Sequence, residues 1–145
     1  MHETVLAPVS IGDLIDRITI LKLKITRIHD TGKRNRAAYE YDRLVATRER
    51  LVLPHDVGAA VKNLAGQLHE VNGQLWDVED QLRRFEHLAE FQKPFIQAAR
   101  SVYHLNDKRA RVKREIYILG ESDIIEEKSY GQPATPYPVF GGTGP

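Results

Sequence analysis

One apolar stripe constrains this chain more than any other feature, because it runs through residues 57–89 without a break. Its members alternate spacings of four and three: Val57, Val61, Leu64, Leu68, Val71, Leu75, Val78, Leu82, Phe85 and Ala89. Such spacing places every member on one face of an α-helix, and chance rarely maintains it over more than four heptads. Gly58, Gly66 and Gly73 lower the local helix propensity, so packing must stabilise this helix. Asp56 is predicted to cap it.

A second apolar stripe predicts a helix over residues 11–28. It consists of Ile11, Leu14, Ile18, Leu21, Ile25 and Ile28, again at spacings of three and four. Ser10 is a favourable N-cap for this helix, and Asp13 follows it as the acid of a short capping box. Gly32 is predicted to end the helix in the left-handed conformation.

Two further helices complete the predicted fold. The one over residues 35–52 is less regular, because Arg48 falls on the same face as its apolar residues, which are Ala37, Tyr41, Leu44 and Leu51. The other begins at Pro94, whose missing amide hydrogen costs nothing in a first turn, and ends at Gly120. Its stripe includes Arg109 as the polar member among Phe95, Ala98, Val102, Leu105, Val112, Ile116 and Leu119.

The short joint between the last two helices makes them antiparallel neighbours. Residues whose numbers sum to about 182 then lie at one height, which places Asn72 beside Arg109. The sequence therefore predicts an all-α helical bundle of about four helices, dominated by a long antiparallel coiled-coil hairpin. Residues 1–130 form its single helical domain. Eight of the last fifteen residues are Gly or Pro, so residues 131–145 are predicted to be a flexible tail.

Composition excludes several kinds of chemistry. The chain has 145 residues, a formal net charge of +1 and no cysteine, which excludes disulfides, thiolate metal sites and a cysteine nucleophile. So small a net charge does not attract nucleic acid or a membrane surface, and the basic residues of positions 100–114 point around their helix. Neither a Glu-x-x-His nor a His-Glu-x-x-His pattern occurs, so no metal site or cofactor is predicted. Neither a signal peptide nor a membrane span is recognised, which predicts a cytoplasmic protein.

Two polar rows flank the seam of the predicted hairpin. The longer helix carries Asn72, Trp76, Glu79, Arg83 and Glu86, and the last helix carries Arg100, Tyr103, Asn106, Asp107, Arg109 and Lys113. One interpretation is a ligand pocket in which Arg and Lys hold a phosphate or carboxylate, Glu79 acts as acid or base and the aromatic rings stack. The other is structural: surface ion pairs such as Glu79 with Arg83, and a polar layer of Asn72 and Arg109 that fixes the register. The residues alone leave both open, and no catalytic residue is assigned.

Four blocks of the sequence resemble a family of small bacterial proteins known only as a domain of unknown function. The blocks are Val9–Ile28, Val71–Arg83, Phe95–Ile116 and Ile125–Tyr130, which leave out the second helix and the tail. The family's pattern includes polar positions, and these match Asn72, Trp76, Glu79, Asp80, Arg83, Arg100, Tyr103, Asn106, Asp107, Arg109, Lys113, Glu126, Glu127, Lys128 and Tyr130. The resemblance thus implies a site near the two polar rows, with residues 126–128 folding back over them. It also implies a link to cell-surface glycan synthesis, because genes of the family accompany glycosyltransferase genes.

These observations predict a non-enzymatic helical interaction or scaffold module whose partner is another protein or a second copy of the chain. A dimer fits because so long a heptad stripe exceeds what one short neighbour can cover. The alternative is a small enzyme or binding protein that holds an anionic metabolite such as a sugar nucleotide. The cluster that would hold it consists of Glu79, Arg83, Arg100, Tyr103, Asn106 and Arg109.

Overall fold

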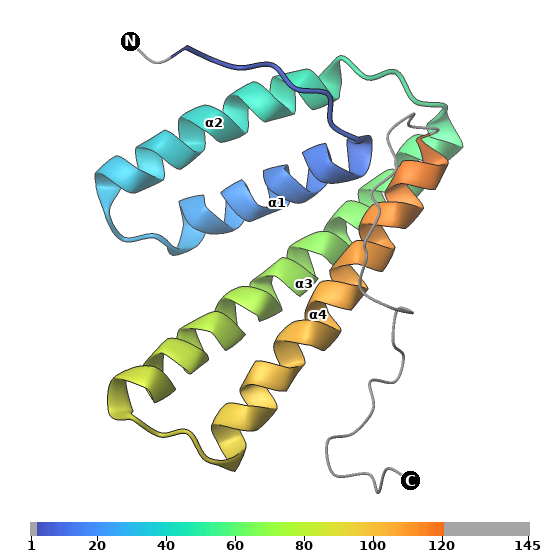
Figure 1. The fold of residues 1–145 in the computed structure, drawn as a ribbon. Coiled ribbons are helices and arrows are strands. Elements are labelled where there is room, and N and C mark those ends of the chain that lie inside the picture. Colours follow the sequence, from blue (N-terminus) through green and yellow to red (C-terminus); the bar gives the residue numbers. More distant parts are fainter. Residues whose placement is uncertain (1–2, 121–145) are drawn as a thin grey trace, which may run out of the picture.

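The computed structural model describes residues 3–120, and these residues form four helices and no strand. The helices are α1 (Ile11–Arg27), α2 (Thr31–Glu49), α3 (His55–Leu88) and α4 (Lys93–Leu119) (Figure 1). The prediction of an all-α fold of about four helices is therefore confirmed. The predicted tail at 131–145 lies outside the described residues.

Polar caps begin the first two helices. The Ser10 hydroxyl oxygen accepts a hydrogen bond from the Asp13 amide at 3.1 Å, which confirms the predicted N-cap of α1. The prediction that Gly32 ends this helix is wrong, because α1 ends at Arg27 and Gly32 lies inside α2. The reason is Asp30, whose carboxylate accepts the Lys33 amide at 2.7 Å and so starts α2 four residues earlier than the predicted Asn35.

The ends of the longer helices depend on backbone conformation. Pro54, and not the predicted Asp56, is the N-cap of α3, and it makes no side-chain cap hydrogen bond. Ala89 does not extend the apolar stripe of α3 but follows its last residue in the left-handed conformation, with a φ of 54°. Pro94 lies in the first turn of α4, as predicted. The left-handed Ala89 lets the chain reverse within four residues, and α4 then returns along α3 (Figure 1).

The core lies where α1 crosses the antiparallel pair of α3 and α4. Its buried members come from these three helices: Ile11, Ile15, Val61, Leu64, Leu68, Val112 and Ile116. Leu68 and Ile116 are fully buried, and each such side chain stabilises the fold by roughly 1.5–3 kcal/mol. The core thus occupies the end of the hairpin where α3 begins and α4 ends. The predicted core of the first helix and the hairpin is confirmed.

Within the described residues, α2 packs against α1 and against no other helix. Ala37 is its one buried residue, and the rest of its surface is half-buried or exposed. Arg17 of α1 and Glu40 of α2 form an ion pair at the edge of this contact. The second helix therefore covers the outer face of α1 and contributes nothing to the centre between α1, α3 and α4.

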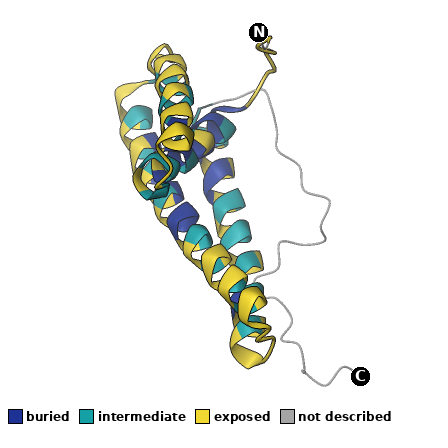
Figure 2. Cartoon of the chain, turned by 90° about the vertical axis from the view of Figure 1, so that its left-hand side faces the viewer, coloured by how far each residue is buried: buried dark blue, intermediate teal, exposed yellow. Residues whose placement is uncertain are grey.

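The far half of the hairpin extends beyond α1. Figure 2 shows buried residues at the end covered by α1 and largely exposed residues toward the α3–α4 turn. There the stripe residues Val78, Leu82 and Phe85 are only half-buried. That the hairpin packs as a coiled coil stays a prediction.

Candidate functional site

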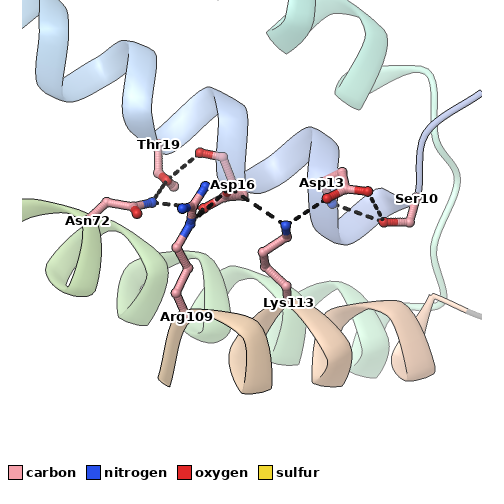
Figure 3. A network of polar contacts seen from close by, with 7 residues as sticks. All are labelled: Ser10, Asp13, Asp16, Thr19, Asn72, Arg109 and Lys113. Carbon is pink, nitrogen blue, oxygen red and sulfur yellow. Dashed lines mark hydrogen bonds and ion pairs between the residues drawn. The ribbon is translucent and has the colours of Figure 1, made fainter. Parts of the chain in front are cut away.

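A buried carboxylate lies at the centre of the contact between α1, α3 and α4. Asp16 of α1 is 4% exposed, and it receives side chains from both helices of the hairpin (Figure 3). Arg109 of α4 binds it in a two-point arrangement, with Nε 3.0 Å from Oδ1 and Nη2 directed at Oδ2. Asn72 of α3 donates from Nδ2 to Oδ1 at 2.9 Å. Asp16 therefore joins three helices through charge-assisted hydrogen bonds.

The second amide hydrogen of Asn72 goes to the same helix. Its Nδ2 donates to the Thr19 hydroxyl oxygen at 2.9 Å, and the Thr19 hydroxyl donates to the Asp16 carbonyl at 2.7 Å. Asn72 is 5% exposed, so satisfying both hydrogens avoids the cost of a buried unpaired donor. Since Asn72 and Arg109 reach one carboxylate, the predicted placement of these two residues at one height is confirmed.

A second ion pair lies one turn closer to the start of α1. Lys113 of α4 places its Nζ 2.8 Å from Asp13 Oδ1 and 4.0 Å from Asp16 Oδ2 (Figure 3). Burial raises the pKa of the Asp13 carboxyl, but the hydrogen bond and charge of Lys113, together with hydrogen bonds from Ser10, outweigh it and hold this pKa below its usual value. The cap of α1 is thereby coupled to α4.

This shift predicts a pH dependence of stability. Because the folded-state pKa of Asp13 is lowered, its contribution is present above the unfolded-state pKa of about 3.9 and is lost as pH falls through the folded-state value. Urea unfolding between pH 6 and pH 2 measures it. Asp13→Asn should lower stability at pH 6 and converge toward wild type in acid. Asp42→Asn, which removes an exposed carboxyl of α2, should run parallel to wild type; parallel curves for both variants would contradict the account.

A pocket of about 230 Å³ opens beside the Asp16 centre. It lies between the three helices and is lined by Ile20 and Leu23 of α1, Asn72, Leu75, Trp76 and Glu79 of α3, and Asn106 and Arg109 of α4. The volume corresponds to roughly seven or eight water molecules. The pocket can hold a small group.

The end of α1 bounds this region. Arg27 places its Nη1 2.6 Å from Asp77 Oδ1 and its guanidinium 5.9 Å from the ring centre of Trp76. The same nitrogen lies 3.5 Å from the carbonyl oxygen of Gly73. These contacts hold Trp76 against α1, with the indole between a cation and the pocket.

The structure brings together only part of the predicted site. Five predicted residues line the pocket, namely Asn72, Trp76, Glu79, Asn106 and Arg109, while Lys113 pairs with Asp13. Arg83, Arg100 and Tyr103 are not among the lining residues. Asp107 has a buried Oδ2 that finds no hydrogen-bond partner among the described residues. The predicted contribution of Glu126, Glu127 and Lys128 lies outside the described residues.

The sequence analysis missed the residues of α1 at this centre. Gly12, Asp16, Thr19 and Leu23 follow spacings of four, three and four, and all are buried. That spacing is the signature of a second buried face, on the side of α1 opposite to the one that α2 covers. The signal was hidden because two of the four residues are polar and one is glycine.

The Asp16 centre joins α1, α3 and α4. Among residues 3–120, no group of three or more His, Asp or Glu side chains could hold a metal ion. None of the helices in that range is long and apolar enough to cross a membrane. Fold and site define a small helical protein in which a buried polar centre fixes a long hairpin to a single crossing helix.

Comparison with known proteins places this chain in one family. A family of unknown function, DUF6165, matches residues 6–145, and the chain belongs to it. No curated protein and no solved structure matches the chain. The predicted membership in an uncharacterised family is confirmed.

Proposed function

We propose that the protein is a non-enzymatic helical interaction module that works through the part of the hairpin beyond α1. The observation that carries this proposal is the exposure of large apolar side chains there. Ile96 is 52% exposed and Phe91 48% exposed, beside the edge-to-face pair of Phe91 and Phe95. Exposed apolar side chains that gather in one region of a small protein commonly mark a contact with another chain.

The surface of the hairpin beyond α1 continues the face on which α1 packs. Asn106 lines the pocket beside α1, and steps of three and four back along α4 reach Tyr103, Ala99 and Ile96. On α3, Glu79 lines the same pocket, and Arg83 follows one turn later. We call this surface the distal face: Val78, Glu79, Leu82, Arg83, Phe85, Phe95, Ile96, Ala99, Val102 and Tyr103. A helical partner can pack on the distal face in the way that α1 packs on the other half of the hairpin.

A second copy of the chain fits the distal face by charge. Two antiparallel copies related by a two-fold axis bring Glu79 of each beside Arg83 of the other, because isologous contacts repeat every pair. The face is about 18 Å long from Trp76 to Leu88 and two helices wide, so the dimer buries on the order of 400 Å² per copy. An interface this small supports a weak, reversible dimer with a Kd on the order of tens of micromolar.

Sedimentation equilibrium on charge-swap variants tests the proposal. Glu79→Arg and Arg83→Glu should each weaken self-association about tenfold, because each places like charges together twice. The double variant restores opposite charges and should return the Kd to within a few-fold of wild type. A wild-type chain that stays monomeric at several hundred micromolar would contradict the dimer. If removal of residues 121–145 then allowed dimerisation, those residues would be the occupant of the distal face.

Two functional predictions from the sequence stay predictions. The role in cell-surface glycan synthesis rests on the family resemblance alone. The anionic-metabolite alternative rests on the cluster of Glu79, Arg83, Arg100 and Arg109, of which Glu79 and Arg109 line the pocket. The predicted cytoplasmic location is likewise a prediction.

A further inference from the structure

We infer that the pocket between α1, α3 and α4 binds a cationic, hydrogen-bond-donating group on a short apolar stem, such as a primary ammonium. This site adjoins the distal face and shares Glu79 with it. Its lining combines aliphatic side chains of α1 and α3 and the indole of Trp76 with a few polar residues. An apolar lining with few polar groups is the usual form of a small-ligand site.

The polar residues that line the pocket offer hydrogen-bond acceptors. Asn72 spends both amide hydrogens on Asp16 and Thr19, so its carbonyl oxygen is the group left for a ligand. Glu79 contributes a carboxylate, which only accepts when ionised, and Asn106 contributes a second amide oxygen. A ligand that complements these oxygens must donate hydrogen bonds.

The local charge favours the same class of ligand. Two guanidiniums lie near the pocket, and each is compensated by a carboxylate: Arg109 by Asp16 and Arg27 by Asp77. Glu79 adds a third carboxylate without a third cation among these groups. These charges reverse the ligand sign predicted from the sequence, where Arg109 was taken as an anion-binding residue.

The only tryptophan of the chain lines the pocket, so its fluorescence reports binding directly. The full chain is titrated with n-butylammonium and, at matched ionic strength, with butyrate. Butylammonium should give a saturable change with a Kd on the order of 1 mM, which is within the range that so small a ligand can reach. Glu79→Gln and Asn106→Leu should each weaken it about tenfold or less, whereas Glu86→Gln, two turns along α3, should leave it unchanged. Tighter binding of butyrate, or no saturable response to butylammonium, would overturn the inference.

The ammonium group that the pocket binds has two sources with the same chemistry: a free amine, and a basic side chain of a second copy of the chain. In the antiparallel dimer proposed above, the two-fold axis lies at about the height of Leu82 and Arg100. The partner subunit's Lys93 then lies level with Asp107, next to the pocket residue Asn106. The partner's Lys93 as the source rests on the proposed function. If it is right, Trp76 emission changes with protein concentration in wild type and not in Lys93→Met. If emission is independent of concentration while dilute protein binds butylammonium, the ligand is a free amine and the pocket stands without the dimer.

Discussion

Replacing Asp16 with alanine should destabilise the protein by about 3 kcal/mol, because it leaves a buried guanidinium and a buried amide without their acceptor. Arg109 is 30% exposed, which places the cost at the lower end of the range for broken buried pairs. A loss of this size is a large fraction of the 5–15 kcal/mol that stabilises an ordinary domain. Urea unfolding followed by circular dichroism measures it.

Asp77→Ala is the matched control for this prediction. Asp77 also pairs with an arginine, and its pair likewise joins α1 to α3, but its side chain is 69% exposed. Exposed ion pairs contribute at most about 1 kcal/mol, so this variant should remain close to wild type. The double variant Asp16→Leu with Arg109→Leu should recover most of the loss, because it removes the charge together with its partner. Equal costs for Asp16→Ala and Asp77→Ala would show that the Asp16 centre does not hold the helices together.

Gly12→Ala should also destabilise the protein strongly. A Cβ added at Gly12 would lie 2.5 Å from the backbone carbonyl oxygen of Lys113, a distance at which either α1 or α4 must move. Overpacking of this kind costs about 1–3 kcal/mol. Moving α1 also lengthens the contacts of Asp13 with Lys113 and of Asp16 with Arg109, so the loss should fall in the upper part of that range.

Gly66→Ala is the control, and it should raise the stability of the protein instead of lowering it. An added Cβ there meets nothing within 4 Å, and Gly66 is exposed in the middle of α3. Alanine at such a position should stabilise the protein by about 0.8–1 kcal/mol through helix propensity. The same unfolding measurement applied to both glycines tests the close approach of α1 to α4. If Gly12→Ala were as stable as wild type, the contact between these helices would have to be looser than described.

Apolar periodicity predicts the helices of this fold and less reliably their ends. The stripe of residues 57–89 predicts α3, and its length together with the short joint predicts the hairpin. The end of α1 depends on a competition between Gly32 as a stop signal and Asp30 as an N-cap. Asp30 prevails because its carboxylate satisfies an amide that would otherwise lack a partner at the start of α2. The sequence contains both signals, and the hydrogen bond of the Asp30 carboxylate decides between them.

The residues of the candidate site that lie on α3 and α4 were predictable from the sequence, whereas those on α1 were not. Arg109 interrupts the apolar stripe of α4, and Asn72 lies in the polar row beside the stripe of α3. Their placement at one height followed from antiparallel geometry. Their common partner, Asp16, did not follow, because the sequence does not show which face of α1 crosses the hairpin. The polar layer proposed for register is therefore present, but it is completed by a third helix. This changes the interpretation of Arg109, whose charge is compensated by Asp16 within the protein.

Disulfide trapping tests the central claim, that two copies associate through the distal face, most directly. The chain has no cysteine, so a single introduced cysteine can form a disulfide only with its counterpart in another molecule. Ala99→Cys lies on the distal face close to the proposed two-fold axis, whereas Ala59→Cys lies exposed at the opposite end of the hairpin. Under mild oxidation at about 50 μM, a concentration comparable to the proposed Kd, the account predicts rapid covalent dimer formation for Ala99→Cys and slow formation for Ala59→Cys. Equal rates for the two variants would contradict it.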